Sequence, residues 1–237
     1  MKFLDLTLPT PAENLACDEA LLENCENGSP HEILRCWELQ KYFAVLGFAN
    51  RAGVELNLEN CHRHQIPVLR RISGGGTVLQ GPGCLNYTLI LKIDPVGETR
   101  SISATNRFVM ERHAELMQKI LAQPVEVRGD TDLALGDLKF SGNAQRRRKH
   151  FLIFHGTFLL NFDVGLMEEC LRPPSKEPGY RRHRAHGDFL VSLGISAGAI
   201  ITALREAWNA QEISSPPPDM RELAAGKYAC DSWNFKR

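Results

Sequence analysis

The pattern of hydrophobic and polar positions predicts several helices separated by strands. Residues 11–25 place apolar side chains at helical spacing after Pro11, and proline is favoured in the first turn of a helix. Residues 101–121 form the longest helical pattern, with apolar side chains toward one face. Further helices are predicted at 54–64, 162–171 and 197–209, and a short one follows the proline-rich linker at 214–218 and ends near Trp233.

Short runs of β-branched, aromatic and aliphatic residues predict the strands. Residues 86–91, Asn-Tyr-Thr-Leu-Ile-Leu, are the clearest of them. Residues 125–162 predict a β-meander, because extended segments alternate with tight turns at Gly129 and Gly136. Other strands are predicted at 34–37, 42–46, 68–69 and 77–79. No internal repeat or strong boundary is visible, so we expect one domain spanning residues 1–237.

The charge balance excludes a general attraction to nucleic acid or to anionic membranes. The 237 residues contain 28 Lys and Arg and 28 Asp and Glu, so any anion binding must be local. The N-terminus has no signal-peptide pattern, and no apolar stretch approaches the ~20 residues of a membrane span. We expect a soluble cytoplasmic protein with neither nucleic acid nor membrane as a partner.

The cysteines favour a reducing compartment over a disulfide framework. They are odd in number and scattered, without a C-x-x-C pair. Most are expected to be small buried side chains. The seven are Cys17, Cys25, Cys36, Cys61, Cys84, Cys170 and Cys230.

Residues 70–78, Arg-Arg-Ile-Ser-Gly-Gly-Gly-Thr-Val, combine fixed positive charge with backbone that a ligand can approach closely. Three consecutive glycines expose amide N–H groups, and two arginines precede them, so the run can hold an anion. Extended segments on both sides predict a strand-loop-strand. The loop does not lead into a helix, and its glycines have neither the spacing of a dinucleotide-binding fingerprint nor that of a Walker loop, so both motifs are excluded. On local evidence, a simple turn fits the glycines equally well.

A second polar cluster follows at residues 130–145. Asp130 and Asp132 precede Lys139, which leads into the small-residue segment 141–144. Residues 155–157, His-Gly-Thr, then interrupt an apolar strand. A hydrogen-bonded core histidine and a ligand-facing one are equally good interpretations of His155.

The glycine loop, the lysine followed by Ser-Gly-Asn-Ala and the His-Gly-Thr segment, in this order, resemble the lipoate-protein ligase family. Its catalytic domain is related to biotin protein ligases and to lipoyl or octanoyl transferases. The resemblance covers nearly the whole chain, including segments 14–21, 46–50 and 227–235. It implies a mixed α/β (α+β type) domain like the catalytic domain of class II aminoacyl-tRNA synthetases. We expect a largely antiparallel central sheet that bears the ligand, with helices packed on its other face.

The resemblance implies that ATP activates lipoate or octanoate to an acyl-adenylate, and that the acyl group is then transferred to a lysine of a lipoyl-carrier domain. Such carriers are E2 subunits of 2-oxoacid dehydrogenases or the glycine cleavage H protein. Lys139 is the expected catalytic residue, since one point charge reaches both carboxylate and α-phosphate oxygens. Arg70 is expected to face the phosphates or the acyl group. The expected substrate and adenylate contacts are Arg70, Ser73, Gly74, Gly75, Gly76, Thr77, Asn86, Ser141, Gly142, Asn143, Ala144, His155, Gly156 and Thr157.

Asp130 and Asp132 are the expected ligands of Mg²⁺, which proteins bind through carboxylates that share the ion with substrate phosphates. The family usually has Asn-Asp where this chain has Asp-Thr-Asp. Many ligases of the family carry an additional small C-terminal domain, or have it as a separate polypeptide. No such domain is expected within residues 1–237, so a small accessory subunit is an expected partner.

Two other functions stay open at this stage. An acyltransferase that moves octanoyl or lipoyl groups between carrier proteins requires an accessible thiol, and Cys84, close to the glycine loop, is the best candidate. A non-catalytic subunit that binds lipoyl domains is the third interpretation, which retention of Lys139 beside an intact glycine loop opposes.

Two basic runs have uncertain roles. Residues 146–150, Arg-Arg-Arg-Lys-His, predict a solvated hairpin tip, or else a docking surface for an acidic lipoyl domain. Residues 181–186 follow three prolines, and we expect a mobile loop that covers the active site.

Overall fold

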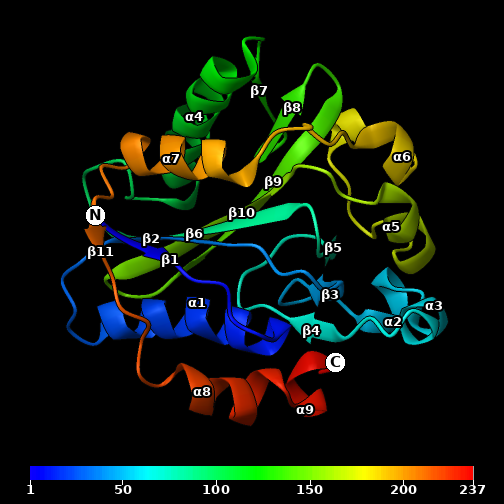
Figure 1. The fold of residues 1–237 in the computed structure, drawn as a ribbon, viewed down its shortest axis with the longest axis horizontal. Coiled ribbons are helices and arrows are strands. Elements are labelled where there is room, and N and C mark those ends of the chain that lie inside the picture. Colours follow the sequence, from blue (N-terminus) through cyan, green and yellow to red (C-terminus); the bar gives the residue numbers. More distant parts are fainter. Residues whose placement is uncertain (237) are drawn as a thin grey trace.

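The computed structural model describes residues 1–236, which form two β-sheets with helices on both sides (Figure 1). The large sheet has eight strands in the order β11-β1-β2-β6-β10-β9-β8-β7. Only the pairs β11–β1 and β1–β2 are parallel, so the predicted largely antiparallel sheet is confirmed. The strands are β1 Lys2–Asp5, β2 Ile33–Trp37, β6 Cys84–Lys92, β7 Glu126–Arg128, β8 Asp132–Leu135, β9 Leu138–Arg147, β10 Phe151–Leu159 and β11 Glu212–Ile213.

The small sheet carries the glycine loop. Its strands are β3 Phe43–Leu46, β4 Val68–Arg70 and β5 Val78–Gln80, in the order β4-β3-β5. The loop leaves the end of β4 and returns as β5 on the other side of β3. The predicted strand-loop-strand is therefore confirmed.

Helices cover both faces of the large sheet because its central strands are apolar on both sides. Successive strand residues point to opposite faces, and Leu89 and Ile90 of β6 accordingly belong to two different cores. Helix α1 packs on the Ile90 side, and α4 and α7 pack on the Leu89 side (Figure 1). Helices were expected on one face only. That expectation was wrong, since α1 shares its face with the candidate site.

The predicted long helices are present. Helix α1 begins with a capping box, in which the Thr10 hydroxyl accepts the Glu13 N–H and the Glu13 carboxylate accepts the Thr10 N–H. The helices are α1 Pro11–Glu26, α2 Ala52–Glu55, α3 Leu58–Arg63, α4 Ile102–Leu121, α5 Val164–Cys170, α6 His186–Phe189, α7 Ala197–Ala207, α8 Met220–Leu223 and α9 Asp231–Asn234, with a 3₁₀ turn η1 Gly179–Arg181 and a π-helical turn η2 Ala224–Tyr228.

The helix predicted at 54–64 is broken in two. Leu56 forms a β-bridge with Leu171, and Asn57 caps α3 by accepting the Asn60 N–H. A contact distant in the sequence therefore interrupts a pattern that looks continuous locally. The β-meander and its turns at Gly129 and Gly136, both at positive φ, are present as predicted.

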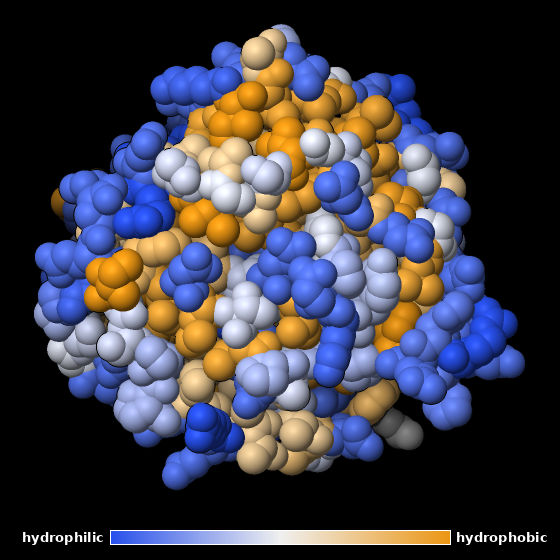
Figure 2. All heavy atoms as spheres, in the orientation of Figure 1, coloured by the Kyte–Doolittle hydropathy of each residue, from blue (hydrophilic) through white to orange (hydrophobic). Residues whose placement is uncertain are grey.

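Figure 2 shows one face of the molecular surface. In the view of Figure 2, hydrophilic residues form much of the rim, and hydrophobic ones are visible between them. Within residues 1–236, no helix is long and apolar enough to cross a membrane.

Candidate active site

A cavity of about 560 Å³ lies between the large sheet, the glycine loop and the segment 174–181. The register of the sheet explains why separate motifs meet there. Thr157 of β10 pairs with Asn86 of β6 on one side and with Gly142 of β9 on the other. Gly142 in turn pairs with Asp132 of β8. The expected residues that line the cavity are Gly75, Gly76, Thr77, Asn86, Asp130, Asp132, Lys139, Gly142, Asn143, Ala144, His155, Gly156 and Thr157.

Lys139 lies on β9 with its ammonium 2.8 Å from Asp132 Oδ1. Its side chain crosses Gly142, where a Cβ atom would lie 2.8 Å from Lys139 Nζ. A larger residue at this position would displace the flexible end of the lysine. The Tyr180 hydroxyl donates to Asp132 Oδ2 at 2.8 Å. Burial and the Asp132 carboxylate raise the pKa of Tyr180 far above its usual value, so Tyr180 keeps its proton and remains a donor.

Arg71 shapes the glycine loop and also lines the cavity. Its guanidinium donates to the Gly74 and Gly76 carbonyls at 2.7 and 2.8 Å, and to Ser73 Oγ at 3.0 Å. It forms no ion pair among the described residues. Burial lowers the pKa of Arg71 to about 10, which still leaves it cationic at neutral pH. A fixed cation thus holds the loop that presents the amides.

The expectation that Arg70 faces the ligand is wrong for this structure. Arg70 is 1% exposed and does not line the cavity. Its guanidinium donates instead to backbone carbonyls, including those of Gly47 and Asn234. The strand alternation at the end of β4 sends the two neighbouring arginines in opposite directions. Ser73, Gly74 and Ser141 also lie outside the cavity lining.

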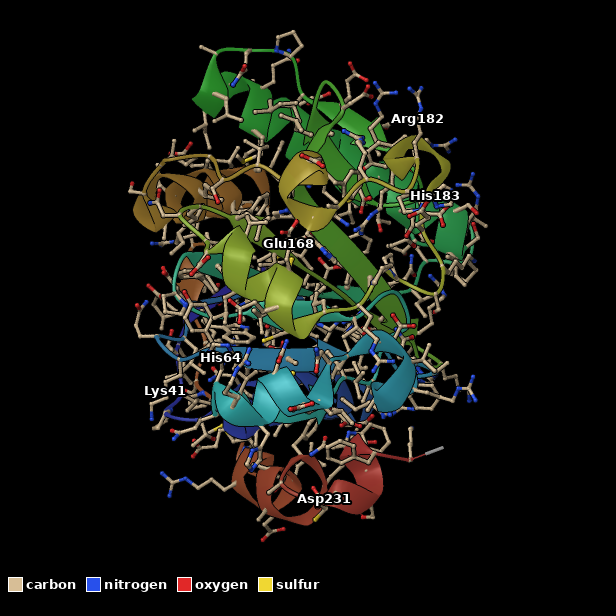
Figure 3. The ribbon with its side chains drawn as sticks, turned by 90° about the vertical axis from the view of Figure 1, so that its right-hand side faces the viewer. Lys41, His64, Glu168, Arg182, His183 and Asp231 are labelled. Carbon is tan, nitrogen blue, oxygen red and sulfur yellow. The ribbon has the colours of Figure 1, made fainter. Side chains whose placement is uncertain are left out.

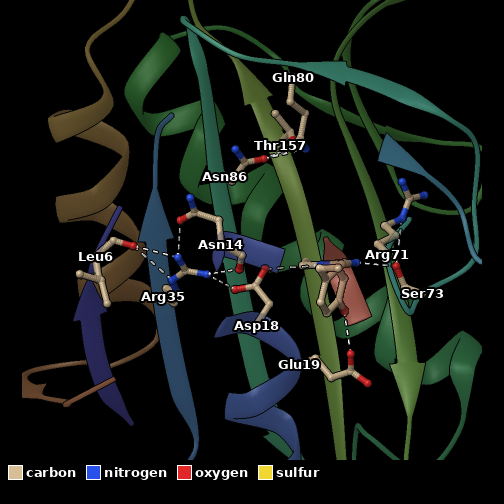
Figure 4. Close-up of polar contacts among 12 residues, drawn as sticks. Leu6, Asn14, Asp18, Glu19, Arg35, Arg71, Ser73, Gln80, Asn86 and Thr157 are labelled. Atoms are coloured by element: carbon tan, nitrogen blue, oxygen red, sulfur yellow. Dashed lines mark hydrogen bonds and ion pairs between the residues drawn. The ribbon is translucent and has the colours of Figure 1, made fainter. Parts of the chain in front are cut away.

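A chain of polar contacts connects the glycine loop with α1 (Figure 4). Ser73 Oγ lies 2.5 Å from His155 Nε2, and His155 Nδ1 lies 3.9 Å from Asp18 Oδ2. Arg35, which is fully buried, binds Asp18 Oδ1 at 2.5 Å. Burial alone would raise the pKa of Asp18, but Arg35 and then His155 hold it below its usual range. His155 is thus hydrogen-bonded and also lines the cavity, so both interpretations of it hold together.

A second polar group lies where β2, β5, β6 and β10 meet. Gln80 Nε2 donates to Asn86 Oδ1 and to Thr157 Oγ1, each at 2.8 Å (Figure 4). Two buried atoms here, Gln80 Oε1 and Trp37 Nε1, have no hydrogen-bond partner among the described residues. Because Gln80 and Trp37 both line the cavity, these atoms are candidates to contact a ligand.

Asn143 and Gly156 fix the floor of the cavity. A Cβ on Gly156 would lie 1.6 Å from Asn143 Oδ1, so only glycine fits at this position. The Tyr87 hydroxyl donates to the same Oδ1 at 2.6 Å, and Asn143 Nδ2 donates to the Thr131 carbonyl at 2.7 Å. Ser141 lies behind this group and accepts from Asn143 at 3.3 Å.

The segment 174–181 forms one wall of the cavity, and of the predicted covering loop, residues 181–186, only Arg181 belongs to the lining. The segment and the charged side chains of Glu168, Arg182 and His183 lie on the side of the molecule seen in Figure 3. Arg181 is buried, and its guanidinium lies 5.0 Å from the Phe189 ring centroid. Burial lowers the pKa of neighbouring His186 to about 4, and the charges of Arg181 and Lys139 add to the effect.

The run 146–150 lies at the end of the β9–β10 hairpin, where Lys149 and His150 are exposed as predicted, but several of its side chains bind other parts of the chain. Arg147 donates to the Thr99 carbonyl at 2.7 Å. Arg148 pairs with Glu23 of α1, and His150 Nδ1 lies 3.0 Å from Glu26 of the same helix. These side chains therefore attach the β9–β10 hairpin to α1.

The expected magnesium ligands do not form a metal site on their own. Asp130 is exposed, and both oxygens of Asp132 already bind protein donors. No group of three or more His, Cys, Asp or Glu side chains within residues 1–236 is arranged to hold a metal ion.

Of the cysteines in the described chain, none lines the cavity. Cys84, the candidate nucleophile, is 0% exposed, and burial raises the pKa of its thiol to about 12. A thiol in that environment is neither ionised nor accessible at neutral pH. Cys84 is therefore not the accessible thiol that an acyltransferase requires.

Asp18, Trp37, Arg71 and Gln80 are among the lining residues that sequence reasoning missed as site residues. Arg71 had a signal, because it is one of the two arginines before the glycines. Asp18 and Trp37 lie within apolar patterns, and only their neighbours in space reveal the cavity.

Comparison with known proteins gives the family. Residues 10–193 match the family model of the lipoyl protein ligase A/B catalytic domain. The octanoyltransferase LipM of Lysinibacillus sphaericus is 24% identical over 272 aligned residues, which cover 99% of this chain and 98% of the relative. Lipoate--protein ligase 1 of Staphylococcus aureus is 30% identical over 173 residues, 73% of this chain and half of the relative.

A crystal structure of lipoate-protein ligase A bound with ATP has the same fold. Its TM-score is 0.79 at 24% sequence identity, and the match covers 99% of each chain. The matched residues 10–193 include the glycine loop, the Lys139 strand and the His-Gly-Thr segment. The chain therefore belongs to the lipoyl protein ligase A/B catalytic domain family.

Proposed function

We propose that this protein is a lipoate-protein ligase. It activates lipoate or octanoate with ATP to an acyl-adenylate and transfers the acyl group to a lysine amine of a lipoyl-carrier domain. The observation that carries the proposal is the meeting of Lys139, Arg71 and the glycine loop in one cavity whose described lining contains no cysteine.

The charges of the cavity suit adenylate formation. A substrate carboxylate oxygen attacks the α-phosphorus of ATP, and pyrophosphate leaves. The attack brings two anions together, so cations and amides directed at their oxygens lower the barrier. Lys139 Nζ would bind a carboxylate and an α-phosphate oxygen, exchanging its contact with Asp132 for the substrate. Arg71 and the amides of Gly75 and Gly76 would bind oxygens from the opposite wall.

The second step transfers the acyl group. The neutral amine of the carrier lysine attacks the carbonyl carbon of the mixed anhydride, and AMP leaves with the bonding electrons. The donors that bind the anhydride oxygens also stabilise the tetrahedral intermediate. No protein thiol takes part in this route.

Within the proposed function, Trp37 favours lipoate over octanoate. Its buried Nε1–H has no partner among the described residues. A ring sulfur is a weak acceptor, whereas an alkyl end offers none, and an unsatisfied buried donor is unfavourable by about 1–3 kcal/mol. We expect a higher kcat/KM for lipoate, lost in Trp37→Phe.

An octanoyltransferase is the alternative, because the LipM relative is similar along nearly the whole chain. That reaction needs an acylated carrier instead of ATP, and a thiol to hold the acyl group. The burial of Cys84 opposes it.

One assay with two arms separates the candidates. The first arm contains lipoate, ATP, Mg²⁺ and a lipoyl domain, and the second contains an octanoylated carrier, a lipoyl domain and no ATP. We expect acylation only in the first arm, lost in Lys139→Ala and retained in Cys84→Ser. Acylation only in the second arm, lost in Cys84→Ser, would contradict the proposal. If the lipoyl domain is acylated in neither arm, even after an accessory subunit is added, the result would support a non-catalytic role.

A further inference from the structure

The guanidinium of Arg70 is a buried cation whose hydrogen-bond acceptors within residues 1–236 are all backbone carbonyls. Taking a guanidinium out of water is unfavourable, and a carboxylate usually compensates it. Arg70 instead donates to six different carbonyls, and no carboxylate of the described residues pairs with it. The acceptors are the carbonyls of Gly47, Phe48, Asn50, Trp233, Asn234 and Lys236, at 2.6 to 3.2 Å. This geometry joins two segments that are almost 200 positions apart.

The first of these segments, the turn 47–50, packs directly on the glycine loop. The Phe48 N–H donates to the Ser73 carbonyl at 2.8 Å, and Asn50 Nδ2 donates to Thr77 Oγ1 at 3.0 Å. A Cβ on Gly47 would lie 2.1 Å from the Gly75 carbonyl oxygen. Any movement of this turn therefore moves the loop.

The second segment, residues 231–236, also binds the backbone of Arg70. Trp233 Nε1 donates to the Arg70 carbonyl at 2.9 Å, and the Arg70 N–H donates to Asn234 Oδ1 at 3.0 Å. Both main-chain groups of the last β4 residue are thus bound from α9. Asp231 marks the start of this helix in Figure 3.

The chain just before this segment is anchored on α1. Lys227 Nζ and the Tyr228 hydroxyl each lie 2.7 Å from the buried Glu19 carboxylate. Residues 227–236, called the strap below, therefore extend from α1 to the start of the glycine loop.

We propose that the strap is a positioning element of the glycine loop, and that Arg70 is the positioning residue through which it acts. Three consecutive glycines have no side chains to restrict their backbone, so a loop of this kind needs a constraint from outside to keep its amides aimed at a ligand. The strap supplies it through Arg70 and the turn 47–50. The consequence for substrate binding rests on the proposed function, whereas the effect on loop dynamics does not.

The test compares substitutions that remove equivalent hydrogen bonds at the strap and elsewhere. Trp233→Phe loses the indole N–H that binds Arg70 and keeps a smaller aromatic ring beside Phe48 and Lys236. Trp208→Phe is its matched control, because it loses an indole hydrogen bond of 2.9 Å to His113 in a core remote from the loop. Arg70→Lys keeps the charge but not the planar fork that reaches several carbonyls.

Hydrogen–deuterium exchange of residues 73–77 gives a readout that needs no activity. We expect about fivefold faster exchange in Trp233→Phe and a larger increase in Arg70→Lys, because local opening becomes easier when a hydrogen bond of the closed state is lost. Trp208→Phe leaves exchange in this loop unchanged. Equal exchange in Trp233→Phe and Trp208→Phe would overturn the proposal, even if both variants lower Tm.

Steady-state kinetics give the second readout. We expect the KM for the acyl acid to rise about tenfold in Arg70→Lys, while the KM for the carrier domain stays within twofold. A fall in Tm with unchanged KM values would show that the strap only stabilises the fold. An inactive wild-type protein would contradict the proposed function alone, since the exchange experiment still tests the strap.

Discussion

The glycine loop and the Lys139 strand face the same cavity, but the first is held through its backbone and the second through an ion pair. Residues 71–77 present amides, and the guanidiniums of Arg70 and Arg71 bind carbonyls of the loop and of the turn beneath it. Lys139 is held by one carboxylate, Asp132, across a glycine that makes room for it. A side chain can adapt to a small change, whereas a backbone loop must shift as a unit. The two walls should therefore respond differently to substitution.

The largest effect is expected on the lysine wall. Lys139→Met should lower the rate of ATP-dependent acylation by about 10³, the order of magnitude for loss of one donor to a developing charge. Single-turnover rates measure this. Lys149→Met is the control, because Lys149 is exposed at the tip of the hairpin formed by β9 and β10. A loss of less than tenfold in Lys139→Met would show that Lys139 does not act in the chemical steps.

The glycine-loop wall should be sensitive to a single methyl group. The added Cβ of Gly47→Ala meets the Gly75 carbonyl, so the loop must move, and we expect kcat/KM to fall by about 10². Gly142→Ala should have a smaller effect, since its Cβ meets only the flexible end of Lys139. Gly74→Ala is the neutral control, with nothing within 4 Å of its Cβ. Equal losses in Gly47→Ala and Gly142→Ala would contradict the contrast between the walls.

Asp132→Asn should have an intermediate effect. The amide keeps the shape but loses the charge that orients Lys139 and accepts from Tyr180. A hydrogen bond to a charged group contributes about 1.5–3 kcal/mol, so we expect roughly a tenfold fall in kcat. Tyr180→Phe removes only the hydroxyl, so its kcat should fall less. If Asp132→Asn is as damaging as Lys139→Met, Asp132 has a direct part in the chemistry.

The smallest effect is expected at Cys84. Cys84→Ser should leave the acylation rate within twofold, because the thiol lies outside the cavity. It should lower Tm by a few degrees, since the hydroxyl replaces an apolar group in a dry site. Loss of activity without loss of Tm would instead indicate a thioester route.

The sequence predicted the elements with local signals better than those set by distant contacts. The capping box of α1 and the glycine turns of the meander need only neighbouring residues, and these elements were predicted. Strands β1 and β11 were missed, because β11 has only two residues and becomes a strand by pairing with β1. The break in the predicted helix at 54–64 depends on Leu171, more than a hundred positions away.

The same limit applies to the candidate site. The motifs of the lysine strand and the His-Gly-Thr segment meet because strand register aligns them, and most of their residues line the cavity. Arg70 and Arg71 have identical side chains in adjacent positions. The acceptors that bind Arg70 outside the cavity come from the turn 47–50 and from the C-terminal strap, both distant from it in the sequence. No local pattern contains that information.

Acid-dependent exchange of labelled pyrophosphate into ATP tests the central claim most directly, because it detects adenylate formation without a carrier domain. We predict exchange that requires lipoate or octanoate in the wild-type protein and in Cys84→Ser, and no exchange in Lys139→Met. Absence of exchange in wild-type protein that transfers octanoyl groups between carriers without ATP would contradict the account.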